Sequence, residues 1–295
     1  MTSLTGVIPI ALTPFDPDGA VDHASIAQLT AFYRRSGASA ITILGIMGEA
    51  AKLSDREREA VTDAYIAAAG PDFPVVVGVS AASTRVAAER ARSAQNAGAA
   101  AVMVAPPPQV RHPGLLQAHF AGVAEAVGIP LVLQDEPVST GVQMPAPLIA
   151  DLAAKIAAIR YVKVEEPPTP TKIRHILAAA PKLSVFGGLG GLYFYEELAR
   201  GAAGVMTGFA FPEILVEVCK RYWAQDREGA RGQFYRYLPL IRFEAQLGAE
   251  GIGIRKVLYA RRDLIAHRTV RAPAPPVDPA TLEDLESLLQ ALGLA

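Results

Sequence analysis

The sequence predicts an α/β fold, a (β/α)₈ TIM barrel with a C-terminal helical extension. Short apolar runs alternate with longer amphipathic segments at intervals of roughly 25 to 35 residues, which is the spacing of repeated βα units. Eight such runs occur in order along the chain. The sixth ends in a lysine, and the carboxyl ends of the strands are where barrels of this kind place their active sites.

The predicted strands are short runs of β-branched and other apolar residues bounded by turn-forming residues. They cover residues 7–12, 40–44, 75–79, 101–105, 131–133, 161–164, 183–186 and 204–206. The segments between them carry helix signals. Ser54 and Glu57 form a capping box that predicts a helix start, and Gly98 predicts a helix end.

The length and composition of the chain favour one large domain. It has 295 residues, of which 51% are hydrophobic and 19% are charged, and this is enough apolar material for a substantial core. We expect a single domain over residues 1–295. Residues 1–210 should form the barrel core, and residues 211–295 should hold the last barrel helix and the extension, which is too short to be a second domain of ordinary size.

Charge and composition narrow the range of partners. A net charge of −1 gives no electrostatic footprint for nucleic acid or for an anionic membrane. No apolar run approaches the length of a membrane span, and the first residues lack the pattern of a signal peptide, so we expect a cytoplasmic protein. The single cysteine, Cys219, excludes an intrachain disulfide, and no cluster has metal-ligand spacing. We therefore expect no metal.

Lys163 is the most informative residue. It follows the apolar run 157–162, and Glu165 and Glu166 come directly after it. Burial disfavours the charged form of an amine and favours the neutral, nucleophilic form that attacks a carbonyl. The other lysines fall in segments that are expected to be helices or loops. Two interpretations remain open from the residues alone: a structural ion pair with Glu165, or a Schiff-base nucleophile.

Other predicted strands also end in residues that suit a binding site better than a core. These are Gly45, Ile46, Met47 and Gly48 after the second strand, Gln134, Asp135 and Glu136 after the fifth, Gly188 within the glycine-rich run after the seventh, and Thr207 after the eighth. Because strand ends meet at one face of a barrel, we expect them to line one pocket. A phosphate site beside the run 187–191 would need a cation, and no lysine or arginine adjoins it.

Together these motifs resemble the dihydrodipicolinate synthase and N-acetylneuraminate lyase family of class I aldolases. The resemblance rests on Thr13-Pro14-Phe15, on Gly45 to Glu49 followed by Leu53-Ser54, on Pro137 with Thr140-Gly141, and on Lys163 followed by Glu165. It implies a (β/α)₈ barrel in which Lys163 forms a Schiff base with pyruvate or another 2-oxo acid, and the protonated imine serves as the electron sink. It also implies a homotetramer, built as a dimer of dimers, without a metal or organic cofactor.

The chain departs from the family pattern at several site positions. Gln134 stands where the family has a tyrosine that relays protons, and Ser139 stands where the synthases have an arginine that holds the second substrate. Ile46 and Met47 replace the paired threonines that hold the substrate carboxylate, which leaves only backbone amides for that task. The proline run 106–108 replaces a second tyrosine. These changes indicate a divergent member with a less polar pocket.

The missing tyrosine leaves the proton relay to another group. We expect Glu136, at the end of the fifth strand, to take that role, with Asp135 as the next candidate. Glu165 is expected to position Lys163. Gln134 has no proton to exchange, but it can orient a hydroxyl or a water, so we expect it to bind substrate.

The sequence thus predicts a Schiff-base-forming lyase, either an aldolase or a dehydratase, acting on a 2-oxo acid such as pyruvate or on a pyruvate-releasing substrate. Two alternatives remain. One is a barrel that binds 2-oxo acids without turnover, which loss of the tyrosines favours and retention of Lys163 opposes. The other is a conventional dihydrodipicolinate synthase despite the altered site. Ile46 and Met47 suggest a substrate with an apolar or aromatic substituent.

Overall fold

Eight parallel strands form one nearly closed barrel in the computed structural model, which describes residues 3–108, 110–246 and 248–294. The strand order is β1-β8-β7-β6-β5-β4-β3-β2. A parallel bridge between Ile10 and Thr42 joins β1 to β2 across the remaining seam. The strands are β1 Gly6–Pro9, β2 Ile41–Ile43, β3 Val75–Gly78, β4 Ala101–Val104, β5 Leu131–Asp135, β6 Ile159–Val164, β7 Ser184–Gly187 and β8 Gly204–Thr207. The predicted fold class is confirmed.

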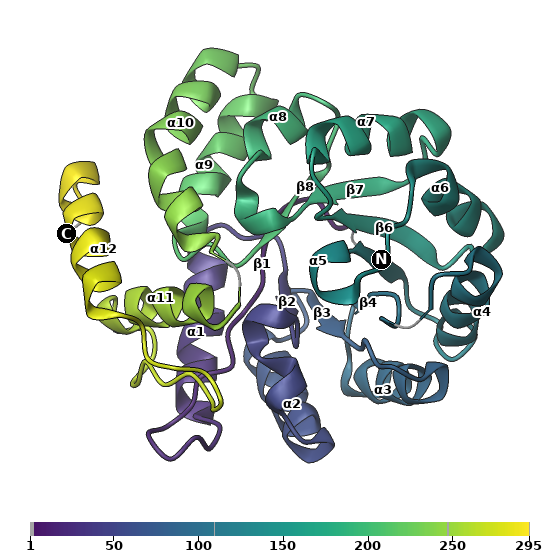
Figure 1. The fold of residues 1–295 in the computed structure, drawn as a ribbon, viewed down its shortest axis with the longest axis horizontal. Coiled ribbons are helices and arrows are strands. Elements are labelled where there is room, and N and C mark those ends of the chain that lie inside the picture. The colour runs from purple at the N-terminus through teal and green to yellow at the C-terminus, as the bar shows by residue number, and fades with distance from the viewer. Residues whose placement is uncertain (1–2, 109, 247, 295) are drawn as a thin grey trace.

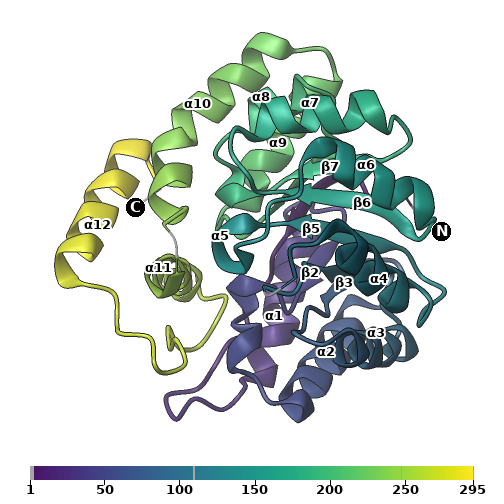
Figure 2. The ribbon, with the colours of Figure 1, turned by 45° about the vertical axis from the view of Figure 1, so that its right-hand side comes forward.

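Helices surround the barrel and continue into a C-terminal group (Figure 1). They are α1 His23–Arg35, α2 Asp55–Ala69, α3 Thr84–Ala97, α4 Pro113–Ala124, α5 Pro137–Thr140, α6 Ala146–Lys155, α7 Thr169–Ala179, α8 Phe194–Leu198, α9 Pro212–Trp223, α10 Arg227–Glu244, α11 Gly248–Arg261 and α12 Pro279–Leu292. Figures 1 and 2 both show α10, α11 and α12 together at one side of the barrel. The capping box of Ser54 and Glu57 opens α2, and Gly98 ends α3 with a positive φ, as predicted.

β5 ends two residues later than the sequence suggested, whereas β6 ends at Val164 as expected. β5 runs on to Asp135, and β6 includes Lys163 and Val164. In the register between these strands, Gln134 is the partner of Lys163. A polar side chain at the end of a buried strand is tolerated when a neighbouring strand supplies a partner. Here Gln134 of β5 donates to Glu165, which in turn pairs with Lys163, and the apolar pattern of a single strand does not reveal this contact.

The apolar core has two layers because side chains alternate between the faces of a strand. Val132, Tyr161 and Met206 belong to the cluster that fills the barrel interior. Leu133 and Val162 belong to the larger cluster between the strands and the helices. This alternation determines which residues at the strand ends face the pocket.

A buried ion cluster attaches the C-terminal extension to the loop after β2. Lys256, on α11, is fully buried, and its Nζ lies 2.6 Å from Glu49 Oε1. Lys52 Nζ and the backbone N–H of Arg271 reach the other carboxylate oxygen of Glu49, at 2.8 and 3.0 Å. Lys163 is therefore not the only buried lysine among the described residues. Burial lowers the pKa of Lys256 to about 8, although Glu49 opposes the shift.

Candidate active site

Lys163 lies at the carboxyl end of the barrel, in contact with a carboxylate. It shares the inward face of β6 with Tyr161, and 5% of the residue is exposed. Its Nζ lies 3.0 Å from Glu165 Oε1, and the side-chain amide of Gln134 donates to Glu165 Oε2 at 2.8 Å. The structure thus brings Lys163, Glu165 and Gln134 together. The carboxylate can hold the amine in place or exchange a proton beside it.

Glycine at position 188 is required for this placement of Glu165. A Cβ on Gly188 would lie 2.3 Å from Glu165 Cγ, so any larger residue would push the carboxylate away from Lys163. The backbone N–H of Leu189 points to Glu165 Oε1 from 3.4 Å. In the structure, Gly188 makes room for Glu165. Its predicted contact with the substrate stays a prediction.

Asp135 does not join this group. It follows Gln134 on β5 and therefore faces the helices, where its Oδ2 lies 2.7 Å from Lys172 Nζ of α7. Lys172 also pairs with Glu166. Burial raises the pKa of Asp135 to about 6, against the opposing effect of Lys172. The expectation that Asp135 lines the pocket is corrected by this strand alternation.

Glu136 caps the short helix α5. Its carboxylate accepts hydrogen bonds from the backbone N–H of Ser139, at 3.0 Å for Oε2, and from the Ser139 hydroxyl. The residue is 7% exposed and borders the large cavity described below. No contact between Glu136 and Lys163 occurs among the described residues. Its predicted role as proton relay stays a prediction, and Glu165 is the carboxylate in contact with the amine.

The turn after β2 presents backbone amides at the mouth of the barrel. The turn Ile46–Gly48 follows Gly45, and the hydroxyl of Thr13 donates to the carbonyl of Gly48 at 2.7 Å. Within the described residues, the amides of Ile46 and Met47 donate to no protein acceptor. This arrangement is compatible with the prediction that amides replace the missing threonines.

The side chains near β8 are arranged differently from the prediction. Thr207 follows the inward-facing Met206 and so lies on the outer face, where its Oγ1 accepts from the N–H of Phe209 at 3.3 Å. The pocket position expected for Thr207 is therefore wrong. Gly208 comes next, and a Cβ there would lie 2.7 Å from Met47 Cγ. Met47 thus covers the end of β8.

A cavity of about 670 Å³ opens at this end of the barrel. Gln134 and Glu136 are on its wall, so Gln134 stands between the cavity and the pair of Lys163 and Glu165. Much of the remaining wall is apolar. The apolar residues are Leu44, Ile46, Ala50, Ala51, Leu53, Ala81, Ala82, Met103, Ala105, Pro106, Pro108 and Ile252. This wall fits the expectation of a less polar pocket.

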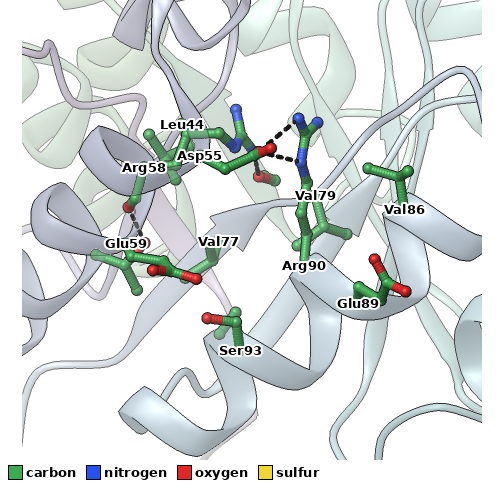
Figure 3. A pocket seen from close by; sticks show the side chains of 13 residues that line it. Leu44, Asp55, Arg58, Glu59, Val77, Val79, Val86, Glu89, Arg90 and Ser93 are labelled. Carbon is green, nitrogen blue, oxygen red and sulfur yellow. Dashed lines mark hydrogen bonds and ion pairs between the residues drawn. The ribbon is translucent and has the colours of Figure 1, made fainter.

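A smaller pocket of about 200 Å³ lies between α2 and α3 (Figure 3). Arg90 turns its guanidinium toward Asp55, with Nη2 2.9 Å from Oδ1. Arg58 donates to the carbonyl of Gly78 at 2.7 Å, and burial lowers the pKa of Arg58 to about 10. These contacts hold both helices to the end of β3. Gln134, which donates to Glu165 beside Lys163, lines the larger of the two cavities and not this pocket, so the larger cavity is the candidate active site.

Across residues 3–108, 110–246 and 248–294, His, Cys, Asp and Glu side chains form no group of three or more that could hold a metal ion. Within the same ranges, no helix has the length and apolar character needed to cross a membrane.

Comparison with known proteins identifies the family of the chain. A model of the Dihydrodipicolinate synthetase family matches residues 3–292. The chain belongs to this family. Its curated relatives include L-2-keto-3-deoxyarabonate dehydratase of Azospirillum brasilense, which is 30% identical over 97% of this chain and 94% of that protein. Another is 4-hydroxy-tetrahydrodipicolinate synthase of Methanosarcina mazei, 31% identical over 98% of both chains.

Solved structures of dihydrodipicolinate synthetase family members share the fold closely. A dihydrodipicolinate synthase from Rhodopseudomonas palustris superposes with a TM-score of 0.93 at 38% identity, over 97% of each chain. YagE of E. coli K12, a prophage protein solved in complex with pyruvate, gives a TM-score of 0.92 at 26% identity, over 100% of both chains. The protein is therefore an enzyme of the pyruvate-type lyase class. The identities near 30% mark it as a divergent member.

Proposed function

We propose that this protein is a Schiff-base-forming dehydratase that removes water from a 4-hydroxy-2-oxo acid. The observation that carries the proposal is the contact of 3.0 Å between Lys163 Nζ and Glu165 Oε1. An imine formed at Nζ places C2 of the substrate beside this carboxylate, with C3 as its neighbour. Glu165 is then the group that can remove a proton from C3, and the imine accepts the electrons.

Dehydration needs one group to move one proton. Glu165 takes the C3 proton to give the enamine, and the electron pair then expels the C4 hydroxyl, which leaves as water with the proton from Glu165. Aldol cleavage instead breaks the C3–C4 bond and needs a base at the C4 hydroxyl. Gln134, which stands where the family has its tyrosine, has no proton to exchange. The relative named L-2-keto-3-deoxyarabonate dehydratase also favours elimination.

The first test identifies the nucleophile. We expect pyruvate or a larger 2-oxo acid, followed by borohydride, to add the mass of a reduced imine to Lys163, because the buried amine lies beside a carboxylate at the carboxyl end of the barrel. Intact mass and peptide mapping measure the adduct. Lys256→Ala is informative as a comparison, because this equally buried lysine faces Glu49 and should not change the labelled site. Equal labelling of Lys163→Ala would overturn the proposal.

Product analysis separates the possible reactions. Incubation with a 3-deoxy-4-hydroxy-2-oxo acid should yield a product lighter by one water. Pyruvate release, measured with lactate dehydrogenase, would show aldol cleavage instead. With pyruvate and aspartate semialdehyde we expect no useful synthase rate, because Ser139 offers no cation to the second carboxylate. An adduct without any turnover would favour a binding protein.

The second test assigns the proton carrier. Glu165→Gln keeps the shape of the side chain and removes its proton exchange, so we expect kcat to fall about 10²- to 10⁴-fold while trapping of pyruvate persists. Glu136→Gln is the matched variant, and we expect it to change kcat less than tenfold, because its carboxylate caps α5. Steady-state rates and trapping are measured on both. If Glu136→Gln lowered kcat more than Glu165→Gln, Glu136 would be the proton carrier.

A further inference from the structure

The guanidinium of Arg255 lies among the loops at the carboxyl end of the barrel, although the residue belongs to the C-terminal extension. Arg255 is on α11 and is 5% exposed. Its Nη1 lies 2.9 Å from Met47 Sδ, in the turn after β2. A Cβ on Gly190, in the turn after β7, would lie 3.7 Å from its Nη2. Met47 in turn packs against Gly208 after β8. Three strand ends therefore converge at this cation.

The protein offers few strong hydrogen-bond acceptors to the guanidinium of Arg255. Among the described residues, the hydrogen-bond acceptor it meets is Met47 Sδ, and a thioether sulfur is a weak acceptor. Glu244 Oε2 lies 3.4 Å from Nε, in an ion pair without hydrogen-bond geometry. That oxygen already accepts from the N–H of Ala210 at 2.8 Å. Buried donors without strong acceptors are costly, so an oxygen-bearing ligand would gain from meeting them.

We propose that Arg255 binds oxygen atoms at the far end of the substrate and so selects 2-oxo acids that carry a carboxylate or hydroxyl groups distal to the carbonyl. This inference rests on the proposed function of Lys163. Both residues lie at the same end of the barrel, one on β6 and the other against the loops after β2, β7 and β8. The turn after β7 links the two residues, because Gly188 packs against Glu165, the partner of Lys163, and Gly190 lies next to Arg255 Nη2. In this proposal, a substrate held at C2 by Lys163 extends along this turn toward the guanidinium.

The chemistry of the residues suits this role. The planar fork of an arginine pairs with a carboxylate or with adjacent hydroxyls, and its charge strengthens each hydrogen bond. Met47 is unbranched and flexible, so it can give up its contact with Nη1 when a better acceptor arrives. The sequence offers no cation next to the run 187–191, and the structure supplies one from α11. The substrate class is thus narrowed to polar-ended 2-oxo acids.

The test compares imine trapping across a series of 2-oxo acids. Pyruvate and 2-oxobutyrate have no distal oxygen, 2-oxoglutarate and 2-oxoadipate have a distal carboxylate, and a 3-deoxy-2-oxo pentonate has distal hydroxyls. The concentration that gives half-maximal borohydride trapping is measured for the wild type, Arg255→Gln and Arg255→Lys. Arg261→Gln is the control, because Arg261 lies on the same helix and pairs at the surface with Glu286.

We expect the wild type to favour acids with distal oxygens, and Arg255→Gln to weaken their trapping about 10- to 100-fold, the loss typical of a charge-assisted hydrogen bond. Pyruvate trapping should stay within about twofold in every variant. Because Arg255→Gln leaves Glu244 without its cation, Arg255→Met with Glu244→Gln serves as a second variant. Equal losses for pyruvate, or no preference in the wild type, would overturn the role of Arg255. No adduct with any acid would overturn the proposed function and this inference with it.

Discussion

A buried carboxyl without a nearby cation keeps its proton at a pH where exposed carboxyls have lost theirs, and Glu197 is such a group. It is fully buried on α8, and its Oε1 accepts from the hydroxyl of Thr169 at 2.5 Å. Its Oε2 has no partner within the described residues and lies where a Cβ on Gly187 would be. Burial raises the pKa of Glu197 to about 8, and the charges of Glu196 and Glu165 add to the shift.

This residue should make stability fall as the pH rises. Between its unfolded value of 4.5 and its folded value of about 8, the folded state holds a proton that the unfolded state has released. The free energy of unfolding therefore falls by up to about 1.4 kcal/mol for each unit that the pH rises in this range. Glu197→Gln keeps the shape and removes the titration. Urea unfolding is measured from about pH 5 to about pH 8. Across this range, the free energy of unfolding of Glu197→Gln should rise relative to that of the wild type.

The neighbouring acid provides the control. Glu196 lies at the surface, where its carboxylate accepts from the hydroxyl of Tyr235 at 2.7 Å. Glu196→Gln should keep a free energy of unfolding that falls as the pH rises, with a slightly smaller total fall than in the wild type, because the charge of Glu196 contributes to the raised pKa of Glu197. If the free energy of unfolding of Glu197→Gln had the same pH dependence as that of the wild type, the carboxyl would be ionised in the folded protein. The assignment of a protonated Glu197 would then be wrong.

At the level of elements, α7 fastens the ends of β5 and β6 to each other. Lys172 of α7 reaches Asp135 on β5 at 2.7 Å and also pairs with Glu166 after β6. The backbone N–H of Glu165 donates to the carbonyl of Asp135 at 2.9 Å. Glu165 thus lies in a segment held on both sides. The ion pairs face away from the barrel interior, so Lys172 acts on the site through the position of Glu165.

Loosening this attachment should slow the reaction more than imine formation. We expect Lys172→Met to lower kcat about 10- to 100-fold, because a shift of about 1 Å in a reacting group has effects of this size. Trapping of pyruvate at Lys163 should persist, and Lys172→Arg should restore part of the rate. Lys155→Met is the matched control, since Lys155 pairs with Asp151 at the surface of α6. A destabilised Lys172→Met enzyme with unchanged kcat would show a purely structural role.

Local pattern predicted the elements well because each strand and cap is encoded by adjacent residues. The capping box of Ser54 and the eight apolar runs are examples. The pairing expected between Lys163 and Glu165 is also present, because the two residues are two positions apart. The face of a residue at a strand end was harder to predict. Asp135 was placed in the pocket, but β5 runs two residues further than predicted, and the alternation along the strand turns Asp135 outward.

Contacts between distant segments were not predictable from the sequence. Gln134 meets Glu165 only because barrel closure sets the register of β5 against β6. Arg255 and Lys256 reach the loops after the strands from a helix of the C-terminal extension, and no local signal marks them. Such contacts depend on how α11 packs on the barrel, which composition and periodicity leave open.

At the level of the whole molecule, two groups of exposed apolar side chains are candidates for contacts between subunits. Ile46 is 52% exposed at the cavity, and Val138 is 57% exposed on α5, next to cavity-lining Ser139. Tyr193 and Tyr235 are 39% and 47% exposed at the start of α8 and on α10. Exposed apolar groups of this size mark contact surfaces, and a dimer of dimers needs two different interfaces. The two groups supply one candidate surface each.

We therefore expect the protein to be a homotetramer, with light scattering giving the mass of four copies of the 31.1 kDa chain. Combining Tyr193→Asp with Tyr235→Asp places charges on the surface at α8 and α10, and should reduce the assembly to two copies while imine trapping persists. Arg85→Ala is the control, because Arg85 pairs with Glu89 on the exposed face of α3. A wild-type monomer at micromolar concentration would contradict the tetramer. A double variant that stays tetrameric would show that α8 and α10 do not join the dimers. Burying two charges per copy in an interface would cost more free energy than the apolar contacts of that interface contribute.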